Sequence, residues 1–509
     1  MQKKNIVRGT LILGIAGIVA KFLGFFFRIP LIYMIGEEGI GLYQLTYPLY
    51  TFLLGLSSGI PIAISKMISE RMALNKTKEA FNVFKVALLI MGLFGGLSSI
   101  FLILFSNTII YSLRWSRDVY YSLLGISLAP FFTCILSAYR GYFQGIQNMV
   151  PPAISQIIEQ IIRVLVGVGL AYLLLPFGIP TAAGGASFGA VAGSIAGLLW
   201  VMFCYCKSKL RFSERQMSSS KIILAMQIFR IAIPISIGQA IGAVMSLIDS
   251  MMVIGLLKIA GFNEQYATIL YGQLTGKAFV LINVPLTLSI ALSQSTVPAI
   301  SESFAIGDRI KIKRDVKMAY KLAMILALPC CAGLYTLAEP ILFLVFQGYS
   351  DGWNLMQILS IAAFFIIIAQ TSTSILNGIG KTLMPVCVMI IGSVIKIAIN
   401  LIFIPIPFLN IKAAAYGTLI TYFIVALIDF ILVVKYTKVN FDFKEIFIKP
   451  LTCTIVMIFM VMLSYIIIYN FTLKRNLTTV ISILCGIAIY FVMLFITRTL
   501  TLTEIKRII

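Results

Sequence analysis

Residues 181–206 read TAAGGASFGAVAGSIAGLLWVMFCYC, a run of 26 residues without a charged side chain. A helix needs roughly 20 apolar residues to cross the hydrocarbon of a bilayer, so this run is long enough to span a membrane. Within it, Gly185, Gly189, Gly193 and Gly197 recur at every fourth position. That spacing places them in one stripe of a helix, along which a second helix can approach closely. We interpret the stripe as a packing surface and not as a ligand site.

Runs of this kind recur along the whole chain. Of its 509 residues, 60% are apolar and 11% are charged, and the mean hydropathy is +1.01, which excludes an ordinary soluble domain with a charged surface. We place membrane spans near residues 8–35, 40–68, 80–106, 117–146, 150–175, 181–206, 222–257, 263–301, 314–346, 352–380, 383–408, 411–436, 446–470 and 476–498. The sequence therefore predicts an all-α polytopic membrane protein with about 14 transmembrane helices.

The basic residues indicate how these spans are oriented. Of the 40 Lys and Arg residues, 28 fall in alternate loops and termini or in the adjoining span ends, and only 6 in or beside the opposite loops. This asymmetry follows the positive-inside rule and predicts that both termini lie in the cytoplasm. Topology and anionic headgroups account for the net charge of +22, so we expect no nucleic-acid partner. With eight Cys, all in or beside apolar runs, and no His, a zinc site or disulfide framework is not expected.

An internal repeat divides the chain. Residues 127–132 (SLAPFF) match residues 360–365 (SIAAFF), and residues 143–146 (FQGI) match residues 376–379 (LNGI), at a constant offset of 233. We predict a six-helix bundle over 1–210, its repeat over 211–440, and two additional transmembrane helices over 441–509. Each half holds an even number of spans, so the copies share one orientation and are expected to face a central cavity.

Six cationic residues are assigned to the interior of the predicted spans and not to the adjoining loops: Lys21, Arg28, Arg140, Arg163, Lys277 and Lys396. A charge near the bilayer centre costs on the order of 2.5–3.5 kcal/mol, so these side chains should line a wet cavity or pair with acids. Lys21, Arg28 and Lys277 have no acid near them in sequence, and the first two lie on nearly the same helical face. We predict that these three residues bind an anionic group.

Two acidic residues inside the spans are candidate partners for these cations, Glu159 and Asp249. Glu159 precedes Arg163 by four residues, so we favour an ion pair along one helix, with ligand contact by Arg163 as the alternative. Arg140 either reaches the interface or faces the protein interior. Lys396 is the counterpart of Arg163 in the repeat and has no acid nearby, so we place it at the cavity. Asp249 either binds a coupling cation or neutralises a neighbouring cation.

The first seventy residues carry a resemblance to a known family. The segment Lys21-Phe-Leu-Gly-Phe-Phe-Phe-Arg28-Ile-Pro-Leu, residues 36–44 (GEEGIGLYQ) and residues 57–66 (SSGIPIAISK) are similar to the stage V sporulation protein B family of polysaccharide exporters. That family belongs to the multidrug/oligosaccharidyl-lipid/polysaccharide superfamily. The resemblance covers essentially the whole chain and implies a MATE-like fold, with two six-helix bundles around a central cavity. Lipid II flippases are more distant relatives.

The resemblance implies a flippase of the bacterial cell membrane. Its substrate would be an undecaprenyl-diphosphate-linked saccharide, a peptidoglycan precursor of the lipid II or spore-cortex type, carried from the inner to the outer leaflet. A basic cavity would replace the water around the diphosphate while the lipid tail stays in the bilayer, and the halves would open alternately. We expect a monomer without cofactor or enzymatic activity, driven by the membrane potential or by a monovalent cation.

Two other functions fit the same fold. A cation-coupled multidrug antiporter needs embedded acids or aromatic cages, and six embedded cations against two clear cases of embedded acids disfavour it. A non-transporting scaffold for envelope assembly would keep its function after neutralisation of Lys21 or Lys277.

Overall fold

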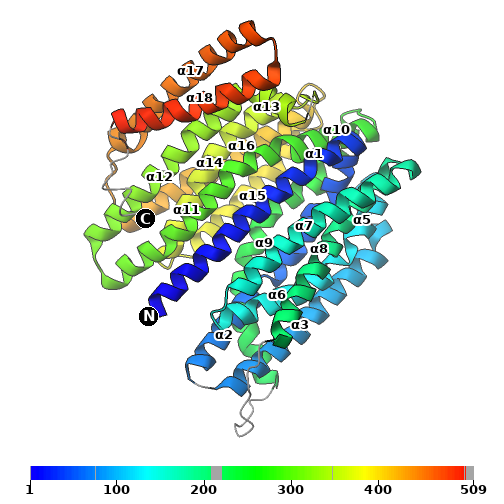
Figure 1. Ribbon diagram of the computed structural model, residues 1–509, viewed down its shortest axis with the longest axis vertical. Coiled ribbons are helices and arrows are strands. Elements are labelled where there is room, and N and C mark those ends of the chain that lie inside the picture. Colours follow the sequence, from blue (N-terminus) through cyan, green and yellow to red (C-terminus); the bar gives the residue numbers. More distant parts are fainter. Residues whose placement is uncertain (1, 75, 208–220, 347, 498, 500–509) are drawn as a thin grey trace. The chain divides into compact units, whose positions relative to one another are not determined.

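The computed structural model describes residues 2–74, 76–207, 221–346, 348–497 and 499. Within these ranges every regular element is helical and no strand occurs (Figure 1). By packing, the chain divides into two compact units, unit 1 (Met1–Gly272) and unit 2 (Gln273–Ile509). The predicted all-α class is confirmed.

Unit 1 is built from ten α-helices and a short 3₁₀ turn in its described residues. Their bounds are α1 Gln2–Ser57, α2 Gly59–Ala73, α3 Thr77–Leu104, α4 Ser106–Ser112, α5 Val119–Ser127, α6 Ala129–Gly145, α7 Val150–Leu174, η1 Leu175–Phe177, α8 Ile179–Lys207, α9 Lys221–Ile259 and α10 Glu264–Gly272. Helices α7 and α8 form its most extensive pair, and α1 packs against α7, α9 and α10.

Unit 2 begins with a π-helical turn. Its elements are η2 Gln273–Ala278, α11 Phe279–Ile306, α12 Arg309–Thr336, α13 Ala338–Val345, α14 Trp353–Gly378, α15 Leu383–Phe403, α16 Asn410–Thr437, η3 Lys444–Ile448, α17 Lys449–Thr472 and α18 Arg475–Ile496. Helices α17 and α18 lie side by side (Figure 1). The Tyr490 hydroxyl of α18 donates to the Ile325 carbonyl of α12 at 2.9 Å, which ties the final pair of helices to the rest of unit 2.

Helix α1 doubles back on itself at Gly36. In a straight helix, residues sixteen positions apart are separated by about 24 Å, yet the rings of Phe27 and Tyr43 lie 5.9 Å apart and Arg28 reaches Gln44 at 3.5 Å. The backbone of Gly36 (φ 65°, ψ −171°) is non-helical and lies in a region that is accessible essentially only to glycine. The fold-back separates the predicted spans 8–35 and 40–68.

Twelve helices in the described part of the chain are long and apolar enough to cross a membrane, so the expected count of about 14 is not confirmed. The longest, Val19–Met72, covers 54 residues and includes the fold-back at Gly36. Helix α9, expected as the seventh span, is not among the twelve, and several of its side chains lie outside the described residues.

The repeat is kept locally in the structure. Helices α7 and α15 begin at Val150 and Leu383, an offset of 233, and Arg163 and Lys396 are buried at the same position of each helix. The predicted boundary at 210/211 lies outside the described residues. The two units are defined by packing and divide at 272/273, whereas the predicted domains are defined by the sequence repeat. The limits of the predicted domains therefore stay predictions.

Replacing Gly36 by Ala is expected to destabilise the protein by about 1–3 kcal/mol, because a side chain opposes the backbone conformation of the fold-back. The space itself is open, since a Cβ there would meet nothing within 4 Å. Thermal unfolding of the purified protein in detergent measures the effect. Gly92 is the control, because it lies in helix α3 and also has open space around it. Gly92→Ala should be neutral or stabilising, and equal losses for both variants would contradict the argument.

Candidate functional site

The glycine stripe of α8 brings this helix into close contact with α7. A Cβ atom on Gly193 would lie 2.5 Å from the carbonyl oxygen of Glu159, and one on Gly189 would lie 2.6 Å from that of Arg163. Because real Cβ atoms do not approach so closely, any larger residue would push the helices apart. The structure thereby confirms the stripe as a packing surface, and the stripe fixes the part of α7 that carries two charged residues.

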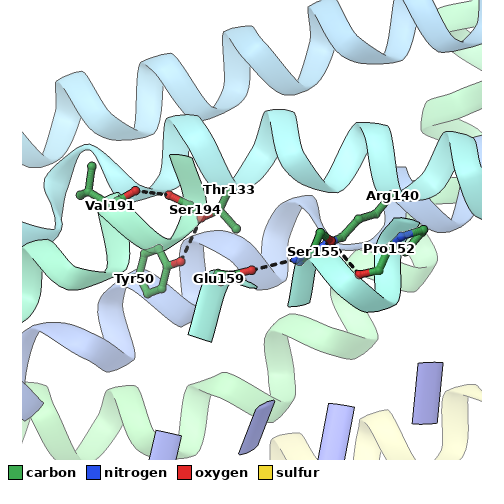
Figure 2. A network of polar contacts seen from close by, with 8 residues as sticks. All are labelled: Tyr50, Thr133, Arg140, Pro152, Ser155, Glu159, Val191 and Ser194. Carbon is green, nitrogen blue, oxygen red and sulfur yellow. Dashed lines mark hydrogen bonds and ion pairs between the residues drawn. The ribbon is translucent and has the colours of Figure 1, made fainter. Parts of the chain in front are cut away.

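Glu159 forms an ion pair with Arg140 of α6. The Arg140 Nη2 donates to Glu159 Oε2 at 2.9 Å, and its Nε donates to the Ser155 hydroxyl at 2.8 Å. Ser155 in turn donates to the Pro152 carbonyl at 2.6 Å, so the guanidinium is held at two points (Figure 2). Arg140 therefore faces the protein interior.

This arrangement corrects the expected pairing of Glu159 with Arg163. Within the described residues Arg163 forms no ion pair with Glu159. The physical reason is that Ser155 and Glu159 lie one turn apart on α7, so a guanidinium from α6 can bind both, whereas Arg163 can offer Glu159 only a contact along its own helix.

A row of tyrosines follows the fold-back of α1. The rings of Tyr43 and Tyr47 lie 6.1 Å apart, and those of Tyr47 and Tyr50 lie 5.8 Å apart. The Tyr50 hydroxyl lies 3.1 Å from the Thr133 hydroxyl of α6 (Figure 2). Helix α1 packs against α7, and this row lies close to Arg163 of that helix.

Arg28 and Arg163 come together beside these tyrosines. Arg163 is only 7% exposed, and the charges of the two arginines act on each other. The Nε atoms of both are buried without a hydrogen-bond partner in the described structure. Two guanidinium groups with unused donors suit an oxyanion such as a phosphate, which accepts several N–H bonds at once. Of the predicted site residues in unit 1, Arg28 and Arg163 are two cations close enough for their charges to act on each other.

The other predicted residues of unit 1 lie apart from this pair. Lys21 is exposed on α1, in the segment where Gly24 approaches Gln160 of α7. Asp249 is buried in α9. Both roles considered for Asp249, and anion binding by Lys21, stay predictions.

Among the described residues of unit 2, two lysines are buried. Lys277 is 1% exposed and lies in the π-helical turn η2, with its Nζ 5.8 Å from the centre of the Phe346 ring. Single π-helical turns frequently occur at functional sites. Lys396 on α15 is 2% exposed, and one turn later Asn400 is also buried. Whether these lysines join Arg28 and Arg163 around one cavity stays a prediction, because they belong to the other unit.

Sequence reasoning missed one buried acid, Asp429 of α16. Its side chain is 0% exposed; Oδ2 accepts a hydrogen bond from the Thr373 hydroxyl of α14 at 3.3 Å, and Oδ1 has no partner in the described structure. The signal was available, since Asp429 is the only acid in the predicted span 411–436.

An apolar cavity of about 240 Å³ lies close to this acid in unit 2. Helices α12, α14 and α16 and the turn η3 line it, largely with phenylalanine side chains. Tyr320 also lines it, with its hydroxyl 2.6 Å from that of Ser372.

Replacing Gly193 by Ala is expected to cost about 1–3 kcal/mol, because the added methyl group overpacks the α7–α8 contact. Thermal unfolding in detergent measures the loss. Gly169→Ala is the control, since Gly169 lies on α7 and a Cβ there would meet nothing within 4 Å. Equal stability of the two variants would contradict the packing role of the stripe.

Curated proteins with similar sequences come from Bacillus subtilis (strain 168). The chain is 28% identical to "Stage V sporulation protein B" over 518 aligned positions, covering 100% of this chain and 98% of that protein. It is 25% identical to "Lipid II flippase MurJ", covering 86% of this chain and 84% of that protein.

Solved structures share the fold at low identity. "Lipid II flippase MurJ, inward closed conformation" has a TM-score of 0.68 at 19% identity and covers 96% of this chain and 99% of that one. An inward-facing multidrug resistance MATE family transporter of the MOP superfamily has a TM-score of 0.69 at 15% identity, with 83% and 94% covered. The fold is therefore MATE-like, and the chain is a multi-pass membrane protein.

Family profiles match both halves of the sequence. The MatE profile matches residues 274–402, and the profile described as polysaccharide biosynthesis protein matches residues 6–304, more than half of the chain. The expected relationship to polysaccharide exporters is confirmed: this chain belongs to the polysaccharide biosynthesis protein family.

Proposed function

We propose that the chain is an alternating-access flippase for an undecaprenyl-diphosphate-linked saccharide. The substrate is a peptidoglycan precursor of the lipid II or spore-cortex type, carried from the inner to the outer leaflet of the bacterial cell membrane. The observation that carries the proposal is the pair Arg28 and Arg163, two guanidinium groups whose charges act on each other. Glu159, the acid that acts on Arg163, is already bound to Arg140.

The electrostatics of this pair favour an anionic ligand. Each arginine held in the membrane interior is costly, and two neighbouring cations add mutual repulsion. An anion placed between them relieves both effects, and the free Nε donors supply hydrogen bonds that replace its water. A diphosphate fits because it carries several charged oxygens on a small group.

Lys21, Lys277 and Lys396 extend the proposed site. In this proposal they line the path of the headgroup, while the isoprenoid tail remains in the hydrocarbon. Alternate opening of the two halves would expose the headgroup to each leaflet in turn. The names of the B. subtilis relatives, a lipid II flippase and a sporulation protein, support this substrate class.

The membrane potential can drive such transport. An inside-negative potential favours outward movement of an anion by about 2.3 kcal/mol per charge per 100 mV. We therefore propose that the protein acts without a cofactor or enzymatic activity, as a monomer with both termini in the cytoplasm.

A cation-coupled multidrug antiporter is the second candidate. The MatE match over residues 274–402 and the similarity to a multidrug transporter favour it. Arg28 and Arg163 disfavour it, because two neighbouring cations repel a cationic drug.

The double variant Arg28→Gln/Arg163→Gln is expected to weaken binding of undecaprenyl diphosphate by about 10-fold or more, because hydrogen bonds to charged groups contribute roughly 1.5–3 kcal/mol each. Native mass spectrometry of the purified protein with increasing lipid concentration measures the bound fraction. The control is Arg117→Gln, an exposed position of unit 1, which removes a charge without touching the pair.

Equal binding by wild type and the double variant would refute the anion site. If the wild type binds undecaprenyl diphosphate no more strongly than bulk phospholipid, the antiporter and scaffold functions are favoured instead. A lipid-flipping assay in liposomes then separates those two from a flippase.

Arg140→Gln is expected to weaken lipid binding although Arg140 does not contact the ligand. The substitution releases Glu159, four residues from Arg163 on the same helix, and the freed carboxylate then competes with the diphosphate for that arginine. The double variant Arg140→Gln/Glu159→Gln should restore binding, measured by the same titration. Failure of the second substitution to restore binding would show that Arg140 acts in another way.

A further inference from the structure

Asp429 occupies an enclosed position between helices α14 and α16, which form the most extensive helix pair of unit 2. Its carboxyl group accepts one hydrogen bond, from Thr373, and its second oxygen is buried without a partner in the described structure. The adjacent α16 residues Ala426 and Phe430 line the apolar cavity. An ionised carboxylate here would face hydrocarbon-like surroundings on one side and a single hydroxyl on the other.

Among the residues that the structure describes, no positive charge forms an ion pair with Asp429. Glu159 of unit 1, in contrast, forms an ion pair with Arg140. From α12, the titratable group that interacts with it is Tyr320, and α14 contributes the uncharged Thr373. Helix α15 packs on α16 and carries Lys396, yet Asp429 forms no ion pair with that lysine. A buried carboxylate that lacks a counter-ion is strongly disfavoured unless it binds a cation or a proton.

The surroundings suit a proton better than a metal ion. Oxygen-bound metal ions need a cage of several oxygen ligands, and Asp429 has a single hydroxyl bonded to it. In the described part of the chain, no group of three or more His, Cys, Asp or Glu side chains could hold a metal ion. A proton needs only the one unpartnered carboxylate oxygen.

We propose that Asp429 is a proton-binding site in the membrane interior, with Thr373 positioning the carboxyl group. Asp429 lies eight residues before the end of α16 at Thr437, about 12 Å along the helix. Lys435 and Lys438 flank that helix end. In the predicted topology that end faces the cytoplasm, so a proton would exchange with that side. Because Thr373 and Asp429 bridge α14 and α16, loss of the proton places a charge inside this helix contact. The idea that proton binding at Asp429 is coupled to transport rests on the proposed function. The idea that Asp429 binds a proton does not.

Infrared spectroscopy of the full-length protein in lipid bilayers tests the site directly. A protonated carboxyl group has a carbonyl stretching band that an ionised carboxylate lacks. We expect this band in the wild type at neutral pH and its loss in Asp429→Asn. In Asp429→Glu and Thr373→Val the band should shift instead, since the carboxyl group or its hydrogen bond has changed, and these variants keep the test valid if Asp429→Asn fails to fold.

Glu159→Gln is the matched control, because it removes a buried acid that, unlike Asp429, forms an ion pair with an arginine, Arg140. It should leave the band unchanged. A band that persists in Asp429→Asn, or one that disappears equally in Glu159→Gln, overturns the proposal. Disappearance of the wild-type band when Na⁺ replaces K⁺ at constant pH also overturns it and assigns the carboxylate to a metal cation. A protein that shows the expected band but flips no lipid would refute the proposed function and leave the proton site standing.

Discussion

The hydrocarbon interior offers no water to a peptide group, and every N–H and C=O within it needs a partner inside the protein. Helices meet that requirement locally, which explains why every regular element in the described chain is helical. The same constraint makes the helix contacts depend on small residues, because apolar side chains gain little by leaving lipid for another apolar surface. The glycines of α8 let α7 approach to backbone distance, and that approach fixes the charged residues of α7.

The lack of water in the hydrocarbon interior also forces charged side chains to find partners inside the protein. Arg140 and Glu159 neutralise each other across two helices, with Ser155 holding the guanidinium in place. Because Glu159 is bound to Arg140, it does not pair with Arg163. Arg28 and Arg163 therefore remain as neighbouring cations beside a row of tyrosines. An excess of buried positive charge is costly in the empty protein and becomes favourable once an anion is bound. The ion pair on α6 and α7 thus supports the proposed site by keeping its counter-ion occupied.

Unit 2 distributes its charges differently. Lys277 is buried against the Phe346 ring in a π-helical turn, and Lys396 is buried at the repeat position of Arg163. Its buried acid, Asp429, lies beside an apolar cavity with one hydroxyl as partner. The two units therefore hold unlike chemistry at the proposed sites: neighbouring arginines in unit 1, and lysines with an isolated carboxyl group in unit 2.

The sequence by itself determined the class of protein. Uncharged runs such as residues 181–206 required helices in a bilayer, the four-residue glycine spacing predicted a close helix contact, and the offset of 233 related Arg163 to Lys396. These properties depend on composition and period, which are visible along one chain. Only the tertiary structure decided which charges meet. Glu159 lies four residues from Arg163 but binds Arg140, nineteen residues away, and Arg28 reaches its partners because Gly36 folds α1 back. Partner choice depends on the positions of other helices, and the enclosure of Asp429 by α14 and α16 was hidden from the sequence for the same reason.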